Sequence, residues 1–588
     1  MLKESENLYG EVFGRLAGGT TEELLLIAEN KDVCAGELFL IPSNRGGKER
    51  IFLFRALDAE NIMRRVSDLS RLAGTLLVEG DAYFANLEKE KLLGISGKLL
   101  GYAEKTDNNW TFRLPRRLPE HLAIVYRPIP GVTDKILREV LSSQVKGELY
   151  VGNLLAGENE LNVPVYIPLS FLPSHLGIFG TTGAGKSNLV EVLIKSCIDI
   201  NLEAYKKGLS SAHRVSMVAI DPHDEFALGI DKRGIQDIVD MMDDEVRRNI
   251  IGDFYYLTPY LAAAARRVRP YARAIRILWS EITPHDILSI REVTPQQADF
   301  LISAYNKWGD RWLSEIFRIE ENEGALGHPS VTVKAVQRRL RFLQRSPIFI
   351  ETGESLLTEI IEALESGRIL VVNTSLLSDL EQFLFTTVVT RTLFDLRRAM
   401  KSSTSWSEFE RNAYGRLPKI FMDKFREKAK RLYIKMRGEE GLTLKEVKEL
   451  PVVMITVEEA PSILNPQLMK GESIFKDIAR QGRKFRIGLI VISQQVTAID
   501  NTILSNMNTE INLKLGNDEE IRAAIKNASI NISGFEREFK VMNRGEAILT
   551  ASYREMPIPL RIPKFDDIFE KDKEKYKLRE KVLGERGL

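Results

Sequence analysis

The eight residues Gly180-Thr181-Thr182-Gly183-Ala184-Gly185-Lys186-Ser187 match the pattern G-x-x-x-x-G-K-[ST]. An apolar segment, Leu176–Phe179, precedes them, and apolar residues at helical spacing follow, among them Leu189 and Leu193. The glycines let backbone N–H groups curl around phosphate oxygens, and a helix N-terminus adds partial positive charge. The octet and Asn188 are therefore predicted to bind ATP, with Lys186 reaching the β- and γ-phosphates and Ser187 ligating Mg²⁺.

A second motif ends in two carboxylates. The apolar strand Val452–Val457 is followed directly by Glu458 and Glu459. Adjacent carboxylates at a strand end are costly unless a cation lies beside them. We expect Glu458 to stand in the Mg²⁺ shell and Glu459 to orient or deprotonate the attacking water. The further apolar strand Arg368–Asn373 lies between the two motifs, which favours the P-loop ATPases that have an added strand and a catalytic Glu.

A third strand is flanked by cationic and amide groups. Ile487–Ile492 leads into Ser493 and Gln494, and the Gln494 amide is suited to bind the γ-phosphate or the attacking water. The basic stretch Ile478–Arg486 precedes this strand. Arg480 or Arg483 is the candidate to act on a nucleotide held by a neighbouring subunit. The alternative is a basic helix end that interacts with its own last-turn carbonyls.

Length and composition are those of a folded, multidomain chain. Of the 588 residues, 44% are hydrophobic and 28% are charged, which are ordinary globular values. The short apolar strands that alternate with helical patterns predict an α/β core with a parallel-type sheet. The predicted organisation is a small β-barrel over 1–150, the α/β core over 151–229 and 366–564, an inserted helical subdomain over 230–365, and a charged C-terminal arm over 565–588.

Charge and cysteine content exclude several classes. Cys34 and Cys197 are the only cysteines, so neither a disulfide framework nor a Cys-rich zinc site is expected. The net charge of +1 creates no global attraction to nucleic acid, so any DNA contact must be local. The candidate DNA contacts are Lys232, Arg233, Arg266 and Arg267, with an ordinary solvated surface as the alternative reading. No apolar run approaches the roughly 20 residues of a membrane helix, and we expect a cytoplasmic protein.

Together these motifs resemble the HerA/FtsK group of hexameric translocases, and HerA most closely. The N-terminal β-rich stretch is similar to the HAS barrel of that family. Three positions depart from the family pattern: Asp224 stands where the family has Gly, Pro461 where it has His, and Gln495 where it has Arg. The resembling segments are Ile178–Asn188, Asp221-Pro222-His223-Asp224-Glu225-Phe226, Val457-Glu458-Glu459-Ala460, Arg480–Gln494 and Gly545-Glu546-Ala547-Ile548.

The resemblance implies a RecA-like P-loop ATPase core in a homohexameric ring, with ATP at each subunit interface and double-stranded DNA in the pore. It also implies a NurA-type nuclease that docks on residues 1–150 and acts with the ring in DNA end resection. The tail from Phe565 would brace the neighbouring subunit. Two alternatives stay open: a ring scaffold that regulates a partner with slow hydrolysis, and a secretion- or conjugation-type ATPase.

Overall fold

The computed structural model describes residues 8–29, 32–61, 92–107, 109–290, 292–320, 323–436, 442–471 and 473–576. The chain divides into two compact units. The first unit comprises Met1–Pro168, Phe179–Gly185 and Thr509–Pro563, and the second comprises Leu169–Ile178, Lys186–Asn508 and Lys564–Leu588.

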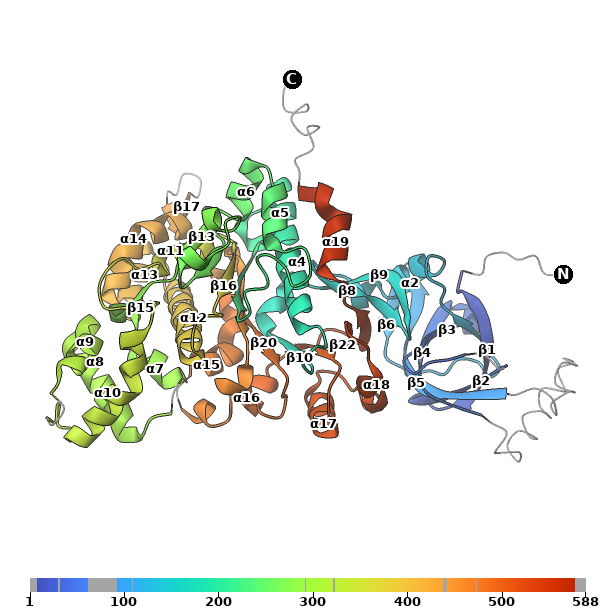
Figure 1. The fold of residues 1–588 in the computed structure, drawn as a ribbon. Coiled ribbons are helices and arrows are strands. Elements are labelled where there is room, and N and C mark those ends of the chain that lie inside the picture. Colours follow the sequence, from blue (N-terminus) through green and yellow to red (C-terminus); the bar gives the residue numbers. More distant parts are fainter. Residues whose placement is uncertain are drawn as a thin grey trace, which may run out of the picture. The chain divides into compact units, whose positions relative to one another are not determined.

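The first unit begins with a closed antiparallel barrel (Figure 1). Its strand order is β2-β1-β7-β3-β4-β5, a further β2–β5 pairing closes it, and β6 extends β5. Aromatic side chains fill the interior: the Phe39 ring lies 4.6 Å from that of Phe13 and 6.0 Å from that of Phe54, centroid to centroid. The strands are β1 (Glu11–Gly19), β2 (Glu23–Glu29), β3 (Leu38–Ser43), β4 (Arg50–Asn61), β5 (Leu92–Thr106), β6 (Asn109–Arg113) and β7 (Ile124–Arg127).

The rest of the first unit is an antiparallel sheet in the order β21-β22-β23-β8-β9. Its strands are β8 (Leu149–Ala156), β9 (Asn159–Ile167), β21 (Thr509–Leu513), β22 (Glu546–Ala551) and β23 (Ile558–Arg561). Four helices accompany them: α2 (Asp134–Val140), α3 (Ser142–Val145), α17 (Asp518–Asn527) and α18 (Glu536–Val541).

The second unit is built on a parallel sheet. Strands β13, β12, β16, β11, β19 and β20 neighbour one another in that order, all in parallel. Every residue of β11, β16, β19 and β20 is buried, as expected for a parallel sheet covered on both faces. The strands are β10 (Leu176–Phe179), β11 (Val215–Asp221), β12 (Tyr256–Thr258), β13 (Ala272–Ala274), β16 (Ile369–Asn373), β19 (Val452–Val457) and β20 (Ile487–Ser493).

Helices α4, α11, α12 and α15 contact the strands of this sheet. The start of α12 shows how the sequence sets a helix boundary, because Ser378 and Glu381 form a capping box. The helices that matter for the sheet and the site are α4 (Lys186–Lys206), α5 (Ile235–Met241), α6 (Asp244–Ile250), α11 (Leu357–Glu365), α12 (Asp379–Lys401), α15 (Ile474–Gln481), α16 (Asn501–Leu504) and α19 (Phe565–Asp572).

The remaining elements of the second unit are helical excursions and short strand pairs. Strand pairs β14–β15 and β17–β18 lie outside the main sheet. The elements are β14 (Ile277–Leu278), α7 (Pro284–Ile290), α8 (Pro295–Trp308), α9 (Trp312–Arg318), α10 (Ser330–Arg345), β15 (Phe349–Ile350), α13 (Trp406–Tyr414), α14 (Lys419–Tyr433), β17 (Ile434–Met436) and β18 (Leu442–Leu444).

The predicted fold class is confirmed: an N-terminal β-barrel accompanies an α/β core with a parallel sheet and added helices. The stretch 230–365 also supplies β12 and β13 to the sheet, which the sequence pattern did not indicate. Three-residue strands are too short to give a period-2 signal. The domain boundaries stay predictions. In the predicted arm, α19 contacts α4 of the same unit, and residues 577–588 lie outside the described residues.

Candidate active site

The glycine-rich loop has the backbone that phosphate binding requires. Gly183 and Gly185 have φ values of 77° and 110°, in the region that side chains disfavour. Two hydrogen bonds within the first unit anchor the loop: Thr181 N donates to Lys514 O at 2.9 Å, and Gly545 N donates to Ala184 O at 3.0 Å. The Gly545-Glu546-Ala547 segment therefore supports the loop from a position far along the chain.

Polar side chains collect at the carboxyl ends of four neighbouring strands in the second unit. Asn373 ends β16, Asp221 ends β11, Glu458 follows β19, and Gln494 follows β20. Because these strands are parallel and adjacent, their carboxyl ends form one edge of the sheet. The structure thus brings together the predicted Glu458 and Gln494 with two strand-end residues.

Lys186, the first residue of α4, interacts electrostatically with the carboxylates of Glu458 and Glu459. Desolvation lowers the pKa of Lys186, and the negative charges of Glu458 and Glu459 oppose that shift. Burial raises the pKa of Glu458 to about 7, aided by the charges of Glu459 and Asp221, while Lys186 acts in the opposite direction. Carboxylates crowded beside one lysine form a site that an added divalent cation would stabilise.

Glu459 adopts an unusual backbone conformation. Its φ and ψ are 46° and 44°, the left-handed region that non-glycine residues rarely occupy. Its side chain is exposed, whereas Glu458 is partly buried. Strain of this kind is commonly retained at functional sites. The two acids are therefore set in different environments, as their different predicted roles require.

The loop after β11, which the sequence analysis identified as a segment resembling the family, is organised by hydrogen bonds that the sequence did not predict. The Asp221 carboxylate accepts hydrogen bonds from Glu225 N at 3.0 Å and Phe226 N at 2.9 Å. Asp224, which replaces the glycine of the resembled family, keeps a glycine-like φ of 59°.

The Tyr256 hydroxyl lies between two polar partners. It donates to Asp224 at 2.5 Å and accepts from the Asn373 amide at 2.7 Å. Asn373 was visible in the sequence as a polar strand end, but the partnership with Tyr256 joins residues 117 positions apart.

Arg480 and Arg483 precede β20 in the chain, so they lie toward its amino end, whereas Gln494 follows its carboxyl end. Arg480 is in the last turn of α15 and Arg483 is in the following 3₁₀ turn, Gly482–Phe485. Both side chains are exposed. Within the described part of the chain, neither forms a hydrogen bond or an ion pair, so both are available to a neighbouring molecule.

A buried histidine connects this arginine segment to the sheet. His175 Nδ1 accepts a hydrogen bond from Leu489 N in β20 at 3.1 Å, which places the proton on Nε2. Nε2 donates to Ala479 O at 3.1 Å, the carbonyl directly before Arg480. Burial lowers the pKa of His175 to about 4. His175 therefore acts as a neutral link between β20 and the end of α15.

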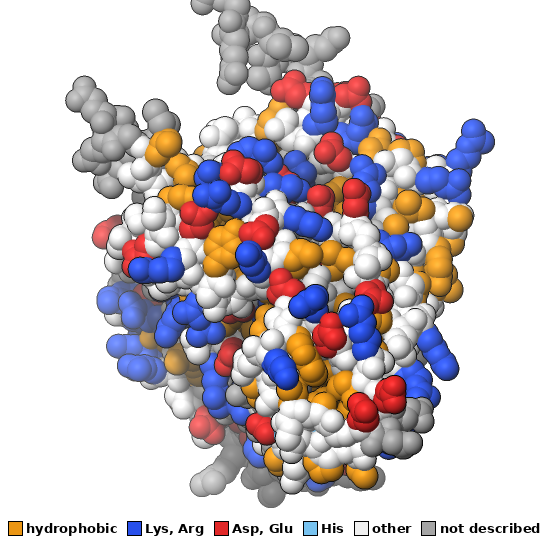
Figure 2. Space-filling view, turned by 90° about the vertical axis from the view of Figure 1, so that its left-hand side faces the viewer, with side chains coloured by type: hydrophobic (Ala, Val, Ile, Leu, Met, Phe, Trp, Pro, Cys, Tyr) orange, Lys and Arg blue, Asp and Glu red, His pale blue; other side chains and the backbone are white. Residues whose placement is uncertain are grey.

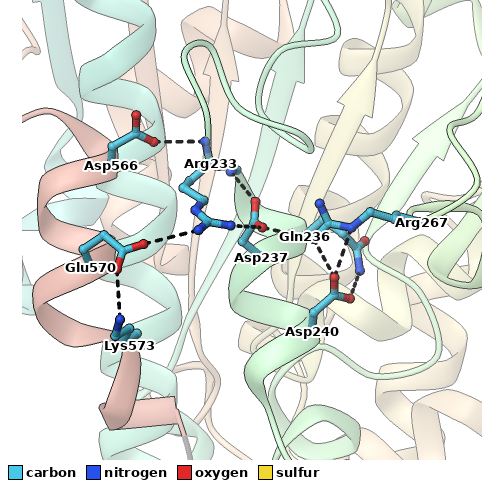
Figure 3. A network of polar contacts seen from close by, with 9 residues as sticks. Arg233, Gln236, Asp237, Asp240, Arg267, Asp566, Glu570 and Lys573 are labelled. Atoms are coloured by element: carbon cyan, nitrogen blue, oxygen red, sulfur yellow. Dashed lines mark hydrogen bonds and ion pairs between the residues drawn. The ribbon is translucent and has the colours of Figure 1, made fainter.

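Two of the four candidate DNA contacts are paired within the chain (Figure 3). Arg233 pairs with Asp237 and Glu570, and its backbone N–H donates to Asp566 at 2.9 Å. Arg267 pairs with Asp237 at 3.0 Å and with Asp240 at 2.6 Å.

The other two candidates differ from this pair. Lys232 and Arg266 are exposed, and among the described residues they form no hydrogen bond or ion pair. On the face of the molecule in Figure 2, Lys and Arg side chains are interspersed with Asp and Glu, in keeping with the net charge of +1.

Asn188 has a structural partner. Its side-chain oxygen accepts a hydrogen bond from Phe565 N at 3.1 Å, at the start of α19. Further along α4, Lys195 pairs with Asp572 at 2.7 Å, and the Tyr576 hydroxyl donates to Asp199 at 3.0 Å. The segment 565–576 is therefore fastened along α4 of its own chain, and the predicted brace to a neighbouring subunit stays a prediction.

The residues present fit a nucleotide with Mg²⁺. The loop supplies backbone N–H groups, Lys186 supplies a cation for phosphate, and Ser187 and Glu458 supply the oxygen donors that Mg²⁺ prefers. In the described residues, no group of three or more His, Cys, Asp or Glu side chains is arranged to hold a metal by itself.

Comparison with known proteins gives concordant matches. Residues 149–393 match the family model of the helicase HerA central domain. The DNA double-strand break repair helicase HerA of Pyrococcus furiosus is 24% identical over 565 residues, covering 92% of this chain and 90% of that protein. The protein of the same name from Sulfurisphaera tokodaii is 22% identical and covers 76% and 75%. Among solved structures, the bacterial conjugative coupling protein TrwB matches with a TM-score of 0.42 and 12% identity, covering 74% and 93%.

The glycine-rich loop, the acidic pair and the parallel sheet define an ATP-hydrolysing P-loop enzyme. The resemblance of this chain to HerA-type ATPases is confirmed by the matched central domain and by similarity that extends over nearly the whole chain. Among the helices that the structure describes, none is both long and apolar enough to cross a membrane.

Proposed function

We propose that the protein is an ATP-driven translocase and helicase on double-stranded DNA. The observation that carries this proposal is the convergence of Lys186, Glu458 and Glu459 beside one sheet edge, in a chain similar to HerA helicases along 92% of its length. A scaffold that only binds ATP needs no water-activating carboxylate. An exposed Glu459 next to a partly buried Glu458 favours hydrolysis.

Each residue has one role in the hydrolytic step. The loop 180–185 and Lys186 bind the phosphates, and Gln494 orients the attacking water or the γ-phosphate. Glu459 accepts the proton of that water. Ser187 and, through water, Glu458 are the residues that would hold Mg²⁺, which when bound would supply positive charge to offset that of the phosphates.

The ring is proposed to be a homohexamer in which an arginine acts across each interface. The exposed Arg480 and Arg483 support this arrangement, because nothing in the described part of the chain neutralises them. An arginine supplied from a neighbour would stabilise negative charge in the transition state. DNA would pass through the pore, gripped by backbone contacts without base readout, and Lys232 and Arg266 are the better placed of the four predicted contacts.

The barrel is proposed to dock a NurA-type nuclease for DNA end resection. Three exposed apolar side chains support an interface there: Val12 on β1, Leu25 on β2 and Ile124 on β7, three neighbouring strands. Replacing Val12 and Ile124 with Asp should abolish co-purification of such a nuclease and leave ATP hydrolysis unchanged. Retained co-purification would contradict this docking site.

The steady-state rate of ATP hydrolysis, with and without linear duplex DNA across a salt series, tests the proposed function. We expect strong stimulation by DNA that decreases with salt, because phosphate contacts release counterions. The Lys186→Ala variant is the control for contaminating activity. Hydrolysis that is indifferent to DNA, or almost none, would contradict the motor and favour the ring scaffold. The cytoplasmic location stays a prediction.

A further inference from the structure

A cavity of about 650 Å³ lies in the second unit at the amino ends of β19 and β20. Its lining includes six cationic side chains and one carboxylate, that of Glu446. The cationic residues are Lys401, Lys445, Lys448, Arg483, Lys484 and Arg486. The volume falls in the range of small-molecule sites. Such an excess of positive charge inside a cavity predicts an anionic ligand.

Most of these cationic side chains form no ion pair with a carboxylate among the described residues. Lys445 donates to Leu432 O at 2.6 Å, Arg486 to Ala212 O at 2.6 Å, and Lys401 to Lys484 O at 3.4 Å. Carbonyl oxygens orient these groups but do not neutralise them. Lys448 is the exception, with Glu446 at 2.8 Å.

The acids near Lys445 are already engaged. Glu449 pairs with Lys435, and Glu365 pairs with Arg397 at 2.9 Å. Desolvation lowers the pKa of Lys445 despite the charges of Glu449 and Glu365. The cavity therefore keeps an excess of positive charge that its surroundings do not offset.

Arg486 adds a second, independent indication. Its Nε atom is buried and, in the described residues, has no hydrogen-bond partner. Its backbone has a φ of 55°, in the left-handed region. Desolvation lowers the pKa of Arg486, and the charge of Arg397 lowers it further. A partly buried guanidinium with one unsatisfied N–H and no carboxylate partner is costly, and an anion in the cavity would relieve that cost.

The cavity is also lined by apolar side chains. These are Leu169, Pro173, Met400, Leu444, Val447 and Val452. A surface of this kind suits a nucleobase, while the lysines and arginines suit a chain of phosphates. Nucleoside polyphosphates combine both features.

The cavity is separate from the predicted active site. Val452, at the start of β19, lines it, whereas Glu458 follows the other end of that strand. Six strand residues span about 16 Å or more, too far for one phosphate chain to contact both ends. From these contacts we propose that the cavity is a second binding site for a nucleoside polyphosphate, distinct from the glycine-rich loop.

Equilibrium dialysis of ATP against the full-length Lys186→Ala variant tests this site, because the substitution disables the predicted active site. We expect about one salt-sensitive ATP site per chain to remain. Adding Lys401→Glu and Lys484→Glu, at two exposed positions, should weaken that site at least tenfold. Lys526→Glu, an exposed change on α17, is the matched control and should have no effect. Residual binding through the glycine-rich loop would survive all of these added changes.

Three outcomes would overturn the proposal as a whole, and a fourth would overturn its nucleoside part. The first is that the Lys186→Ala variant binds no ATP, and the second is that the Lys401→Glu/Lys484→Glu changes leave its binding intact. The third is that a duplex oligonucleotide displaces ATP and depends more strongly on the same lysines, which would make the cavity a DNA backbone contact. Inorganic tripolyphosphate should compete at least tenfold more weakly than ATP; equal competition would overturn the nucleoside part.

Discussion

The two ends of β19 and β20 carry opposite chemistry. At the carboxyl ends stand Glu458 and Gln494, next to Asp221 on the neighbouring strand. At the amino ends stand Arg483 and Arg486, together with lysines from α12 and the β18 region. A parallel sheet aligns like ends of its strands, so one edge gathers carboxylates and amides and the other gathers cations. The acidic edge fits water activation in the same subunit, and the cationic edge fits anions brought from outside it.

Removing Arg480 and Arg483 should have the largest effect on ATP hydrolysis. The double substitution Arg480→Ala and Arg483→Ala should lower kcat for ATP by roughly 10³–10⁵, the usual contribution of an arginine supplied across an interface. Mixing this variant with Lys186→Ala subunits should restore some hydrolysis, because mixed interfaces combine an intact loop with an intact arginine. Arg522→Ala is the exposed control. No restoration at any mixing ratio would contradict action between subunits.

Replacing the water-activating acid tests the opposite edge. Glu459→Gln should lower hydrolysis by about 10²–10⁴, since the amide cannot accept the proton of the attacking water. ATP binding and ring assembly should persist, as measured by dialysis and by size-exclusion chromatography. Glu519→Gln, an exposed acid on α17, is the matched control. Wild-type turnover by Glu459→Gln would show that another group activates the water.

The lowered pKa of His175, which lies beside the cationic edge, predicts how the stability of the fold depends on pH. Because its pKa in the fold is about 4 against an ordinary value of 6.5, the unfolded chain binds the extra proton first. The contribution of neutral, buried His175 to the free energy of unfolding is therefore complete above about pH 6.5. It is lost as the pH falls through about 4, and the loss amounts to about 3 kcal/mol.

The urea midpoint of the full chain at pH 7 and pH 4.5, compared with that of His175→Asn, measures this loss. The advantage of the wild-type chain over the variant should shrink at the lower pH. A parallel loss of stability by both proteins would contradict the buried neutral imidazole.

The smallest effect is expected outside both edges, in the network of Figure 3. Arg267→Ala removes a half-exposed guanidinium from Asp240 and from the buried Asp237, which keeps its pair with Arg233, and should lower the free energy of unfolding by at most about 1 kcal/mol. Arg266→Ala removes an exposed charge that is not paired in the described residues, so it should weaken DNA binding more than Arg267→Ala does. Filter binding at two salt concentrations measures the difference, and the reverse order would contradict this ranking.

The sequence predicted what is local and could not predict what packing creates. The glycine-rich loop and Glu458-Glu459 are contiguous motifs at strand ends, so residue type and spacing were enough to select them as candidates, and their roles stay predictions. The Tyr256–Asn373 hydrogen bond and the cationic cavity each join segments that are far apart in the chain. Some of these residues, such as Asn373 and Arg483, stand out in the sequence, but nothing in the sequence indicates which residues they contact. Asp224 lies between these two cases. The sequence shows that it replaces the Gly of the resembled family, but only the structure shows that its φ stays positive, as a glycine's could.

Displacement of a triplex-forming strand from duplex DNA tests the central claim, that hydrolysis at the acidic edge drives movement along DNA. The wild-type protein should release the third strand only when ATP is present. Glu459→Gln should bind ATP and DNA but release nothing. Release that is unchanged in Glu459→Gln, or robust ATP hydrolysis by the wild type without any release, would contradict the account.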